Sequence, residues 1–330
     1  MIDLSRMSKQ EVIIICTLLV CIVVMIFFMT LPAKVRNERK IAAEPQNILQ
    51  TGGGPGQERG FFSTPRGIAV DAAGNIYVAD SKNHRIQKFN RDGNFVTAWG
   101  KEGAGPGEFR EPCGIDVASD GTVYVADTWN GRVQVFSNTG SFLFDVGRDS
   151  GLWGPRDCAV DKEGNIYICD TGFGKIEKFD KNGRFLLTIG KKGGGKGPGE
   201  FIEPFGIKAG PDNNIYVLDR KNYRLQVLTS EGKYVREFKI DGWADAQQVG
   251  SCLMEPYLDI DWENKKIYIS DPTNHRVFRH DLDGRNKKII DKDMRQAQLM
   301  CPIGVAVFTD GRVLTTDHAA GKIAVLSAGN

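Results

Sequence analysis

A unit of 43 to 52 residues recurs six times in this sequence, and it restricts the possible folds more than any other feature. One copy reads PRGIAVDAAGNIYVADSKNHRIQKFNRDG, at residues 65–93. Every copy begins at a proline: Pro65, Pro112, Pro155, Pro204, Pro256 and Pro302. A period of this size indicates a repeat architecture, in which each unit buries its apolar face against the next unit.

Each unit contains four short segments that are typical of β-strands. In the first copy they cover residues 67–70, 75–79, 85–89 and 95–99, where Val, Ile, Tyr and Phe alternate with polar residues. Gly-Asn and Asp-Gly turns separate the segments, in keeping with the content of 39 glycines. We therefore predict an all-β fold, a six-bladed β-propeller with one four-stranded sheet per repeat.

The two ends of the repeat region complement each other. The sixth copy stops after its third strand segment, at residues 322–326, while residues 47–56 resemble the fourth-strand segment at 95–107 of the first copy. We therefore expect residues 44–56 to supply the outer strand of the last blade and to close the ring. The propeller domain would then span residues 44–330.

An uncharged apolar segment precedes the repeats, from Val12 to Leu31, and it has the length that a helix needs to span a bilayer. We predict a short N-terminal tail at residues 1–11, a transmembrane anchor of the uncleaved signal-anchor type at 12–31, and a basic linker at 32–43. The alternative is a signal peptide that is cleaved after Ala33. The apolar run exceeds the usual core of a signal peptide and no A-x-A site follows, which favours the retained anchor.

Two arguments about the side of the membrane point in opposite directions. Two bases precede the span, whereas four follow it closely: Lys34, Arg36, Arg39 and Lys40. The positive-inside count therefore favours a cytoplasmic propeller. An N-terminal anchor on a soluble propeller, however, usually serves to hold it outside. We expect a single-pass membrane protein whose propeller is extracytoplasmic.

The charge balance argues against a nucleic-acid-binding protein, and the cysteine content argues against a disulfide-rich or zinc-knuckle protein. The formal net charge is +2, and basic and acidic residues nearly balance beyond residue 43. Such a domain lacks the field that drives binding to a phosphate backbone, so we do not expect nucleic acid as a partner. The cysteines beyond the apolar segment are odd in number and widely spaced, and they predict neither a disulfide framework nor a zinc knuckle. They are Cys113, Cys158, Cys169, Cys252 and Cys301.

Short motifs inside the unit resemble the NHL repeat, which is named after an Asn-His-Leu-like signature. The clearest are Asn83-His84-Arg85-Ile86 and Asn274-His275-Arg276-Val277, and the resemblance covers residues 44–326. It implies the propeller fold but no single function, because NHL propellers include RNA binders, extracellular sensors, adhesion modules and a metal-dependent amidating lyase. Membrane-anchored NHL domains of bacterial surface proteins and receptors are the most similar in architecture.

Each copy also carries an aspartate fifteen residues after its proline and a base five residues after that aspartate. The pairs are Asp80 with Arg85, Asp127 with Arg132, Asp170 with Lys175, Asp219 with Arg224, Asp271 with Arg276, and Asp317 with Lys322. A hairpin between the second and third strands makes the two residues cross-strand neighbours. Recurrence in every blade indicates a structural role for these pairs.

Function is better sought where the copies differ. The residue after the first proline of each copy should surround the mouth of the central channel: Arg66, Cys113, Arg156, Phe205, Tyr257 and Ile303. Neighbouring loops add Trp129, Trp153, Tyr223 and Trp243. Aromatic side chains beside arginines suit sugar faces, anionic groups or peptide side chains. The candidate ligand-binding residues on this loop face are therefore Arg66, Arg156, Phe205, Tyr257, Trp129, Trp153, Tyr223 and Trp243, unless the aromatics only cap blade junctions.

The resemblance also raises the hypothesis of a metal-dependent lyase or hydrolase, because amidating lyases of this fold hold zinc with histidines around the channel. The weak candidates here are His84, His275 and His318, but no closely spaced pair of histidines supports a ligand cluster. We expect no catalytic residue and no cofactor. The sequence favours a membrane-anchored, non-enzymatic binding or scaffold module for a protein partner of a membrane assembly or a cell-surface glycan. An RNA-binding NHL domain is a third alternative.

Overall fold

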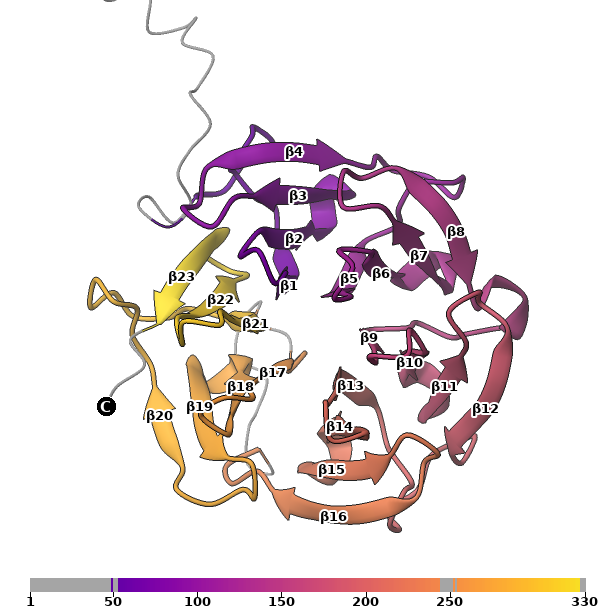
Figure 1. Cartoon of the computed structure of the whole chain (residues 1–330). Helices are drawn as coiled ribbons and strands as arrows, with labels where there is room; N and C mark the ends of the chain where they lie inside the picture. The colour runs from indigo at the N-terminus through magenta and orange to yellow at the C-terminus, as the bar shows by residue number, and fades with distance from the viewer. Residues whose placement is uncertain (1–48, 50–52, 244–251, 253, 327–330) are drawn as a thin grey trace, which may run out of the picture. The chain divides into compact units, whose positions relative to one another are not determined.

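Six small antiparallel sheets follow one another around a central axis in the computed structural model (Figure 1). The structure describes residues 49, 53–243, 252 and 254–326. In this part of the chain, five sheets have four strands and the last has three. Within each sheet the strands are hydrogen-bonded in sequence order, which is the meander expected of a propeller blade.

The first three sheets come from the first three repeats. Sheet 1 contains β1 (Pro65–Val70), β2 (Ile76–Asp80), β3 (Arg85–Phe89) and β4 (Phe95–Trp99). Sheet 2 contains β5 (Pro112–Val117), β6 (Val123–Asp127), β7 (Arg132–Phe136) and β8 (Phe142–Val146). Sheet 3 contains β9 (Cys158–Val160), β10 (Ile166–Asp170), β11 (Lys175–Phe179) and β12 (Phe185–Gly190).

The remaining sheets complete the ring. Sheet 4 contains β13 (Pro204–Ala209), β14 (Asn214–Asp219), β15 (Arg224–Thr229) and β16 (Tyr234–Lys239). Sheet 5 contains β17 (Leu258–Asp261), β18 (Lys266–Asp271), β19 (Arg276–Asp281) and β20 (Lys288–Ile290). Sheet 6 contains β21 (Pro302–Val307), β22 (Val313–Asp317) and β23 (Lys322–Leu326).

A short 3-10 turn follows the second strand in the first five sheets, and one more lies between β8 and β9. These turns are η2 (Ser81–Asn83), η3 (Thr128–Asn130), η4 (Arg148–Ser150), η5 (Thr171–Phe173), η6 (Arg220–Asn222) and η7 (Pro272–Asn274). The residue that ends the hairpin turn adopts a left-handed conformation, for example His84 with φ 51° and Gly131 with φ 62°. Glycine adopts this conformation at no steric cost, whereas histidine does so less readily.

The hydrophobic core of the described residues has six layers, one between each pair of neighbouring sheets, and a smaller cluster around the Cys252–Cys301 disulfide. The layer between sheets 1 and 2 includes Tyr77, Ile86 and Phe109 against Val125 and Phe136. A corresponding cluster joins sheet 6 to sheet 1. Since the last sheet packs on the first just as the others pack on their neighbours, the ring is closed by core packing.

The N-terminal segment that we expected to close the ring, residues 44–56, lies mostly outside the described residues. Of residues 44–56, Leu49 packs against the cluster between sheets 6 and 1, and Gly53 forms an antiparallel bridge with Lys322 of β23. Asp293 bridges Leu326 at the other end of the same strand. The outer strand that residues 44–56 would supply to the last blade stays a prediction.

The predicted transmembrane anchor at 12–31, with its flanking tail and linker, also lies outside the part of the chain that the structure describes. Among the described residues, no helix is long and apolar enough to cross a membrane.

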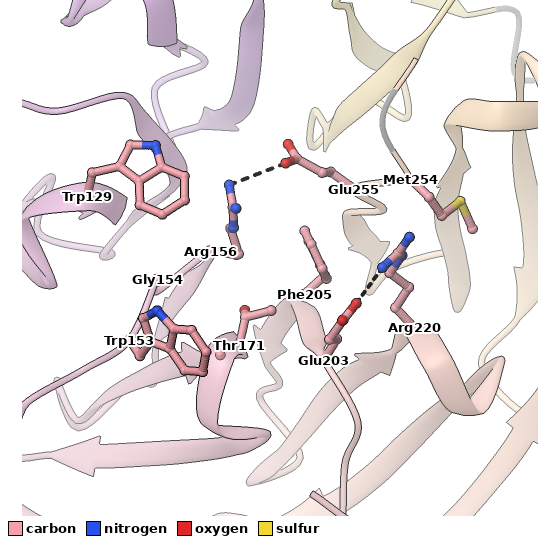
Figure 2. Close-up of a pocket in the computed structure, with 11 residues that line it drawn as sticks. Trp129, Trp153, Gly154, Arg156, Thr171, Glu203, Phe205, Arg220, Met254 and Glu255 are labelled. Atoms are coloured by element: carbon pink, nitrogen blue, oxygen red, sulfur yellow. Dashed lines mark hydrogen bonds and ion pairs between the residues drawn. The ribbon is translucent and has the colours of Figure 1, made fainter. Parts of the chain in front are cut away.

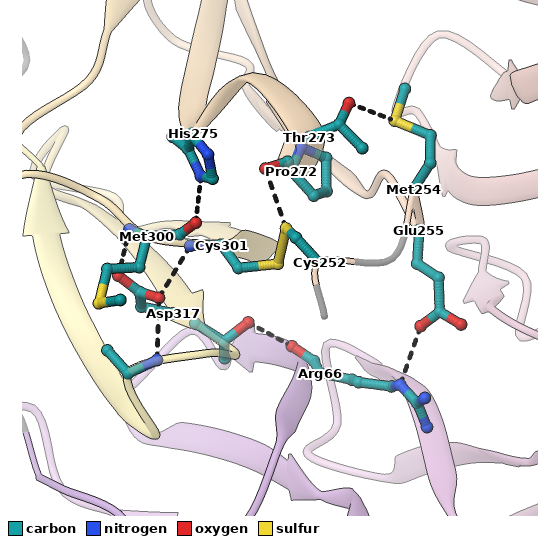
Figure 3. The surroundings of a disulfide bond; sticks show 12 residues. Arg66, Cys252, Met254, Glu255, Pro272, Thr273, His275, Met300, Cys301 and Asp317 are labelled. Carbon is teal, nitrogen blue, oxygen red and sulfur yellow. Dashed lines mark hydrogen bonds and ion pairs between the residues drawn. A yellow bond between two sulfur atoms is a disulfide. The ribbon is translucent and has the colours of Figure 1, made fainter. Parts of the chain in front are cut away.

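The cysteine analysis needs one correction, because Cys252 and Cys301 form a disulfide (Figure 3). These residues are 49 positions apart, and their Cα atoms lie 5.7 Å apart. The bond joins the segment before β17 to the segment before β21, so it connects neighbouring blades. The spacing of the cysteines along the chain did not reveal this bond, because only the packing of neighbouring blades brings the two residues together. The other three cysteines beyond the apolar segment are buried.

Candidate functional site

A network of ion pairs beside the axis links the inner-strand segments of four blades, the first, second, third and fifth. Glu255 lies between two arginines, with 2.8 Å from its Oε2 to Nε of Arg66 and 3.2 Å from its Oε1 to Nη1 of Arg156. A second carboxylate, Glu111, lies 3.3 Å from Nη1 of Arg66. Both arginines also donate toward Sγ of Cys113, at 3.5 and 3.7 Å. This network holds the Arg156 side chain in place at the edge of an open cavity.

The cavity beside this network has a volume of about 420 Å³ (Figure 2). It is bounded by side chains from the third, fourth and fifth repeats and by one hairpin turn of the second. Its lining residues are Trp129, Trp153, Gly154, Arg156, Thr171, Gly172, Glu203, Phe205, Arg220, Met254 and Glu255. Trp129 and Trp153 are 53 % and 59 % exposed, an unusual state for such large apolar side chains.

Two arginines lie on either side of the Phe205 ring in this cavity. The guanidinium carbon of Arg156 is 5.8 Å from the ring centroid, and that of Arg220 is 5.7 Å from it. Arg156 also lies 5.2 Å from the Trp129 ring. At these distances the ring faces attract the cations. The site therefore combines flat apolar surfaces with planar hydrogen-bond donors.

Both cavity carboxylates have cationic partners. Glu203 pairs with Arg220 and, at 2.5 Å, with Lys221. Burial acts to raise the pKa of Glu203, but the hydrogen bond from Lys221 and the charge of Arg220 outweigh it, so the pKa lies below its ordinary value. Burial likewise acts to lower the pKa of Arg156, but Cys113 and Glu255 outweigh it and the pKa is raised. Glu203 and Arg156 are both charged at neutral pH.

The residue before the first proline of a repeat adopts a costly backbone conformation in several blades. Thr64, Glu111 and Glu203 have φ of 52°, 51° and 56°, and Gly154 has φ of 62° at the same repeat position. Left-handed backbone is unfavourable for residues other than glycine, and a following proline restricts the residue further. Gly154 shows that glycine fits this position in the third blade. A glutamate that stays there despite the strain indicates a use for its carboxylate.

The structure brings half of the predicted ligand-binding residues together at this cavity. Trp129, Trp153, Arg156 and Phe205 line it. Arg66 and Tyr257 do not. Arg66 is buried in the ion-pair network, and Tyr257 is buried and donates from its hydroxyl to the carbonyl of Arg156 at 2.9 Å. These two residues position the site rather than face a ligand.

Two further candidates lie elsewhere. Tyr223 is 40 % exposed in the hairpin turn after β14, but it does not line this cavity. Trp243 was expected on the loop face and lies instead in the hydrophobic layer between sheets 4 and 5, where it is 1 % exposed. Its large apolar indole fills the space between two blades, which explains the difference.

Sequence reasoning missed the charged half of the cavity. Glu203 and Arg220 were not among the candidates, and Glu255 and the apolar Met254 beside it were expected at the mouth only as part of the long insertion 242–255. A usable signal was present, because Glu203 and Glu255 are the residues that precede Pro204 and Pro256. The pre-proline position of the third, fourth and fifth repeats therefore lines the cavity, like the position after the proline in the third and fourth.

The repeated Asp–base residues do not line the cavity, and each pair forms cross-strand neighbours within its blade. The registers pair Asp80 with Arg85, Asp127 with Arg132, Asp170 with Lys175, Asp219 with Arg224, Asp271 with Arg276, and Asp317 with Lys322. In the first five blades the charged atoms lie 2.7 to 3.6 Å apart. In the sixth, Nζ of Lys322 is 4.0 Å from Asp293 instead.

Local contacts account for two of the three histidines considered for a metal site, whereas Nδ1 of the buried His318 has no hydrogen-bond partner among the described residues. Nδ1 of His84 accepts a hydrogen bond from the Glu111 amide at 3.2 Å, and Nδ1 of His275 contacts the Met300 carbonyl. His318 is buried, and burial lowers its pKa. Within the described ranges, no group of three His, Cys, Asp or Glu residues is arranged to hold a metal ion.

Comparison with known families agrees with this architecture. The NHL repeat family matches residues 62–89 and 109–136, and a family described as a six-bladed β-propeller matches residues 156–251. Local relatives include lin-41 of Caenorhabditis elegans, 42 % identical over 62 residues, and peptidyl-glycine alpha-amidating monooxygenase B of Xenopus laevis, 40 % identical over 68 residues. Each match covers 19 % of this chain but only 5 % and 8 % of these relatives.

Solved structures share the fold over most of the chain. A virginiamycin B lyase from Staphylococcus aureus is 18 % identical with a TM-score of 0.56, over 81 % of this chain and 82 % of the lyase. A gluconolactonase from Xanthomonas campestris is 15 % identical with a TM-score of 0.59, over 81 % of this chain and 86 % of that protein. At such low identity these likenesses show the fold alone. The chain is thus a six-bladed β-propeller that contains NHL repeats.

Proposed function

We propose that this chain is a membrane-anchored, non-enzymatic binding module that captures a cell-surface glycan in the cavity beside Trp129, Trp153 and Phe205. The two exposed indoles at the rim carry the proposal. Exposing two tryptophans to water costs hydrophobic free energy, about 25 cal/mol for each Å² of apolar surface. A ligand with a flat apolar face, such as a pyranose ring, would cover them.

The polar half of the cavity suits the rest of a sugar. Hydroxyl groups both donate and accept, and the cavity offers carboxylate acceptors in Glu203 and Glu255 beside guanidinium donors in Arg156 and Arg220. The strained backbone of Glu203 supports a role in binding, since the equivalent Gly154 shows that the fold itself does not require glutamate.

The disulfide supports an extracytoplasmic propeller. Disulfides persist in oxidising compartments and are rare in the cytosol. The Cys252–Cys301 bond therefore weighs against the positive-inside count of the linker. In our proposal, a helix at residues 12–31 anchors the chain and residues 44–330 lie outside the cytoplasm. Protease added to intact spheroplasts should then degrade the propeller, whereas a cytoplasmic propeller would survive.

Glycan capture tests the binding role. The full chain in mild detergent should be retained on immobilised cell-surface polysaccharide, and Trp129→Ala/Trp153→Ala should weaken retention at least tenfold without lowering the melting temperature. Leu143→Ala is the matched control, because Leu143 is 50 % exposed on the outer strand β8, away from the cavity. Equal retention of the double variant and the wild type would refute the proposed site.

A further inference from the structure

The guanidinium groups of Arg156 and Arg220 form hydrogen bonds within the protein through only some of their N–H donors. Arg156 contacts Glu255 and Cys113 through Nη1, and Arg220 contacts Glu203 through Nη1. Among the described residues, Nε and Nη2 of both guanidinium groups have no hydrogen-bond partner. Both groups line the cavity, 5.8 and 5.7 Å from the Phe205 ring centroid, so their unused donors are available to a ligand in it (Figure 2).

The charges of the cavity lining balance, but each of the two ion-pair networks beside it contains one more cation than carboxylates. Five cations share the ion pairs of this region with three carboxylates. The cations are Arg66, Lys82, Arg156, Arg220 and Lys221, and the carboxylates are Glu111, Glu203 and Glu255. A ligand that brings one carboxylate would improve the balance and would match the planar fork of an arginine.

The same carboxylates restrict the ligand further. Glu203 and Glu255 line the cavity, so a di- or triphosphate would place several negative charges beside two fixed ones. A ligand with a single carboxylate and several hydroxyls avoids this repulsion, because its hydroxyls donate to the glutamates. The geometry thus favours one negative charge on a hydroxylated ring.

We infer that the cavity binds a carboxylate-bearing sugar residue of an acidic glycan. Its carboxylate accepts hydrogen bonds from Arg156 and Arg220, and its ring stacks on an exposed indole at the rim. This inference rests on the proposed glycan binding and adds the chemical class of the sugar. It predicts a preference for uronic acids over the neutral sugars of the same configuration.

Calorimetric titration of the full chain in detergent tests the inference. The ligands are three matched pairs of trisaccharides: galacturonate and galactose, glucuronate and glucose, mannuronate and mannose. At least one acidic ligand should bind tenfold or more tightly than its neutral partner. Arg220→Gln and Arg156→Gln should each reduce that ratio to threefold or less. Arg184→Gln is the control, since Arg184 lies in an exposed hairpin with its side chain 80 % exposed.

The outcomes separate this inference from the proposed function. If the neutral sugar binds as tightly as its acidic partner in all three pairs, and the tryptophan variant abolishes binding, the cavity binds glycans but the charge argument is wrong. If Arg184→Gln lowers the ratio as much as the cavity variants, the preference comes from general charge and the inference is also wrong. If none of the six ligands binds, the inference is overturned and the polysaccharide retention assay decides the proposed function alone.

Discussion

Removal of the Asp127 carboxylate should unfold the propeller at a markedly lower temperature. Asp127 and Arg132 both have side chains that are 0 % exposed, and their charged atoms lie 2.9 Å apart. Asp127 also accepts hydrogen bonds from the Arg110 amide at 2.8 Å, from Asn130 at 2.9 Å and from Gln134 at 3.0 Å. Asp127→Ala therefore leaves four donors without this acceptor, and two of the four hydrogen bonds, from Arg132 and Gln134, are buried.

The magnitude follows from what Arg132 keeps. Breaking a buried ion pair costs roughly 3–5 kcal/mol. Arg132 still contacts Asp145 at 2.9 Å and two backbone carbonyls, so the loss should lie near about 3 kcal/mol. For a domain of this size, that corresponds to a fall of about 6–12 °C in melting temperature. Glu163→Ala, which alters an exposed carboxylate, should leave the melting temperature unchanged.

Circular dichroism melting of the full chain in detergent measures the difference between these variants. A change of less than about 3 °C for Asp127→Ala, corresponding to about 1 kcal/mol, would refute the reasoning.

Three further perturbations test other parts of the structure. Deletion of residues 44–56 should lower the melting temperature by about 5 °C, as expected for a loss of about 2 kcal/mol when the edge of the last blade is exposed, and an unchanged value would refute ring closure by this segment. Cys252→Ser/Cys301→Ser opens a loop with a sequence separation of 49 and should cost about 4 kcal/mol by chain entropy, whereas equal stability with and without reductant in the wild type would show that the bond is not formed. Burial holds the pKa of His280 below 6.5 in the folded state, so the unfolded state binds the proton first and the unfolding free energy should fall as pH drops below about 7. His280→Phe should flatten this part of the pH profile, and an unchanged slope would exclude His280 as its source.

The fold was predictable because its determinants are local and repeated. The strand bounds of the first copy agree within two residues with β1 to β4, and the hairpin between Asp80 and Arg85 forms where the turn residues indicate. Part of the site followed from the same logic, since Arg156 and Phe205 occupy equivalent repeat positions and reach one cavity.

Other parts of the site depend on contacts between blades, which no local pattern encodes. Arg66 was predicted to face a ligand, but the carboxylate that buries it, Glu255, comes from a repeat far along the chain. Trp243 follows β16 in a long interblade segment, and its burial depends on how that segment packs on the next sheet. The Cys252–Cys301 bond arises for the same reason.

Recovery of the ligand after binding tests the central claim most directly, because it separates a binding module from an enzyme of the same fold. The full chain, loaded with the tightest-binding trisaccharide and washed, is denatured, and the released sugar is analysed by mass spectrometry. We predict stoichiometric release of the unchanged trisaccharide from the wild type and none from Trp129→Ala/Trp153→Ala. A released sugar of altered mass, or equal amounts from both proteins, would contradict the account.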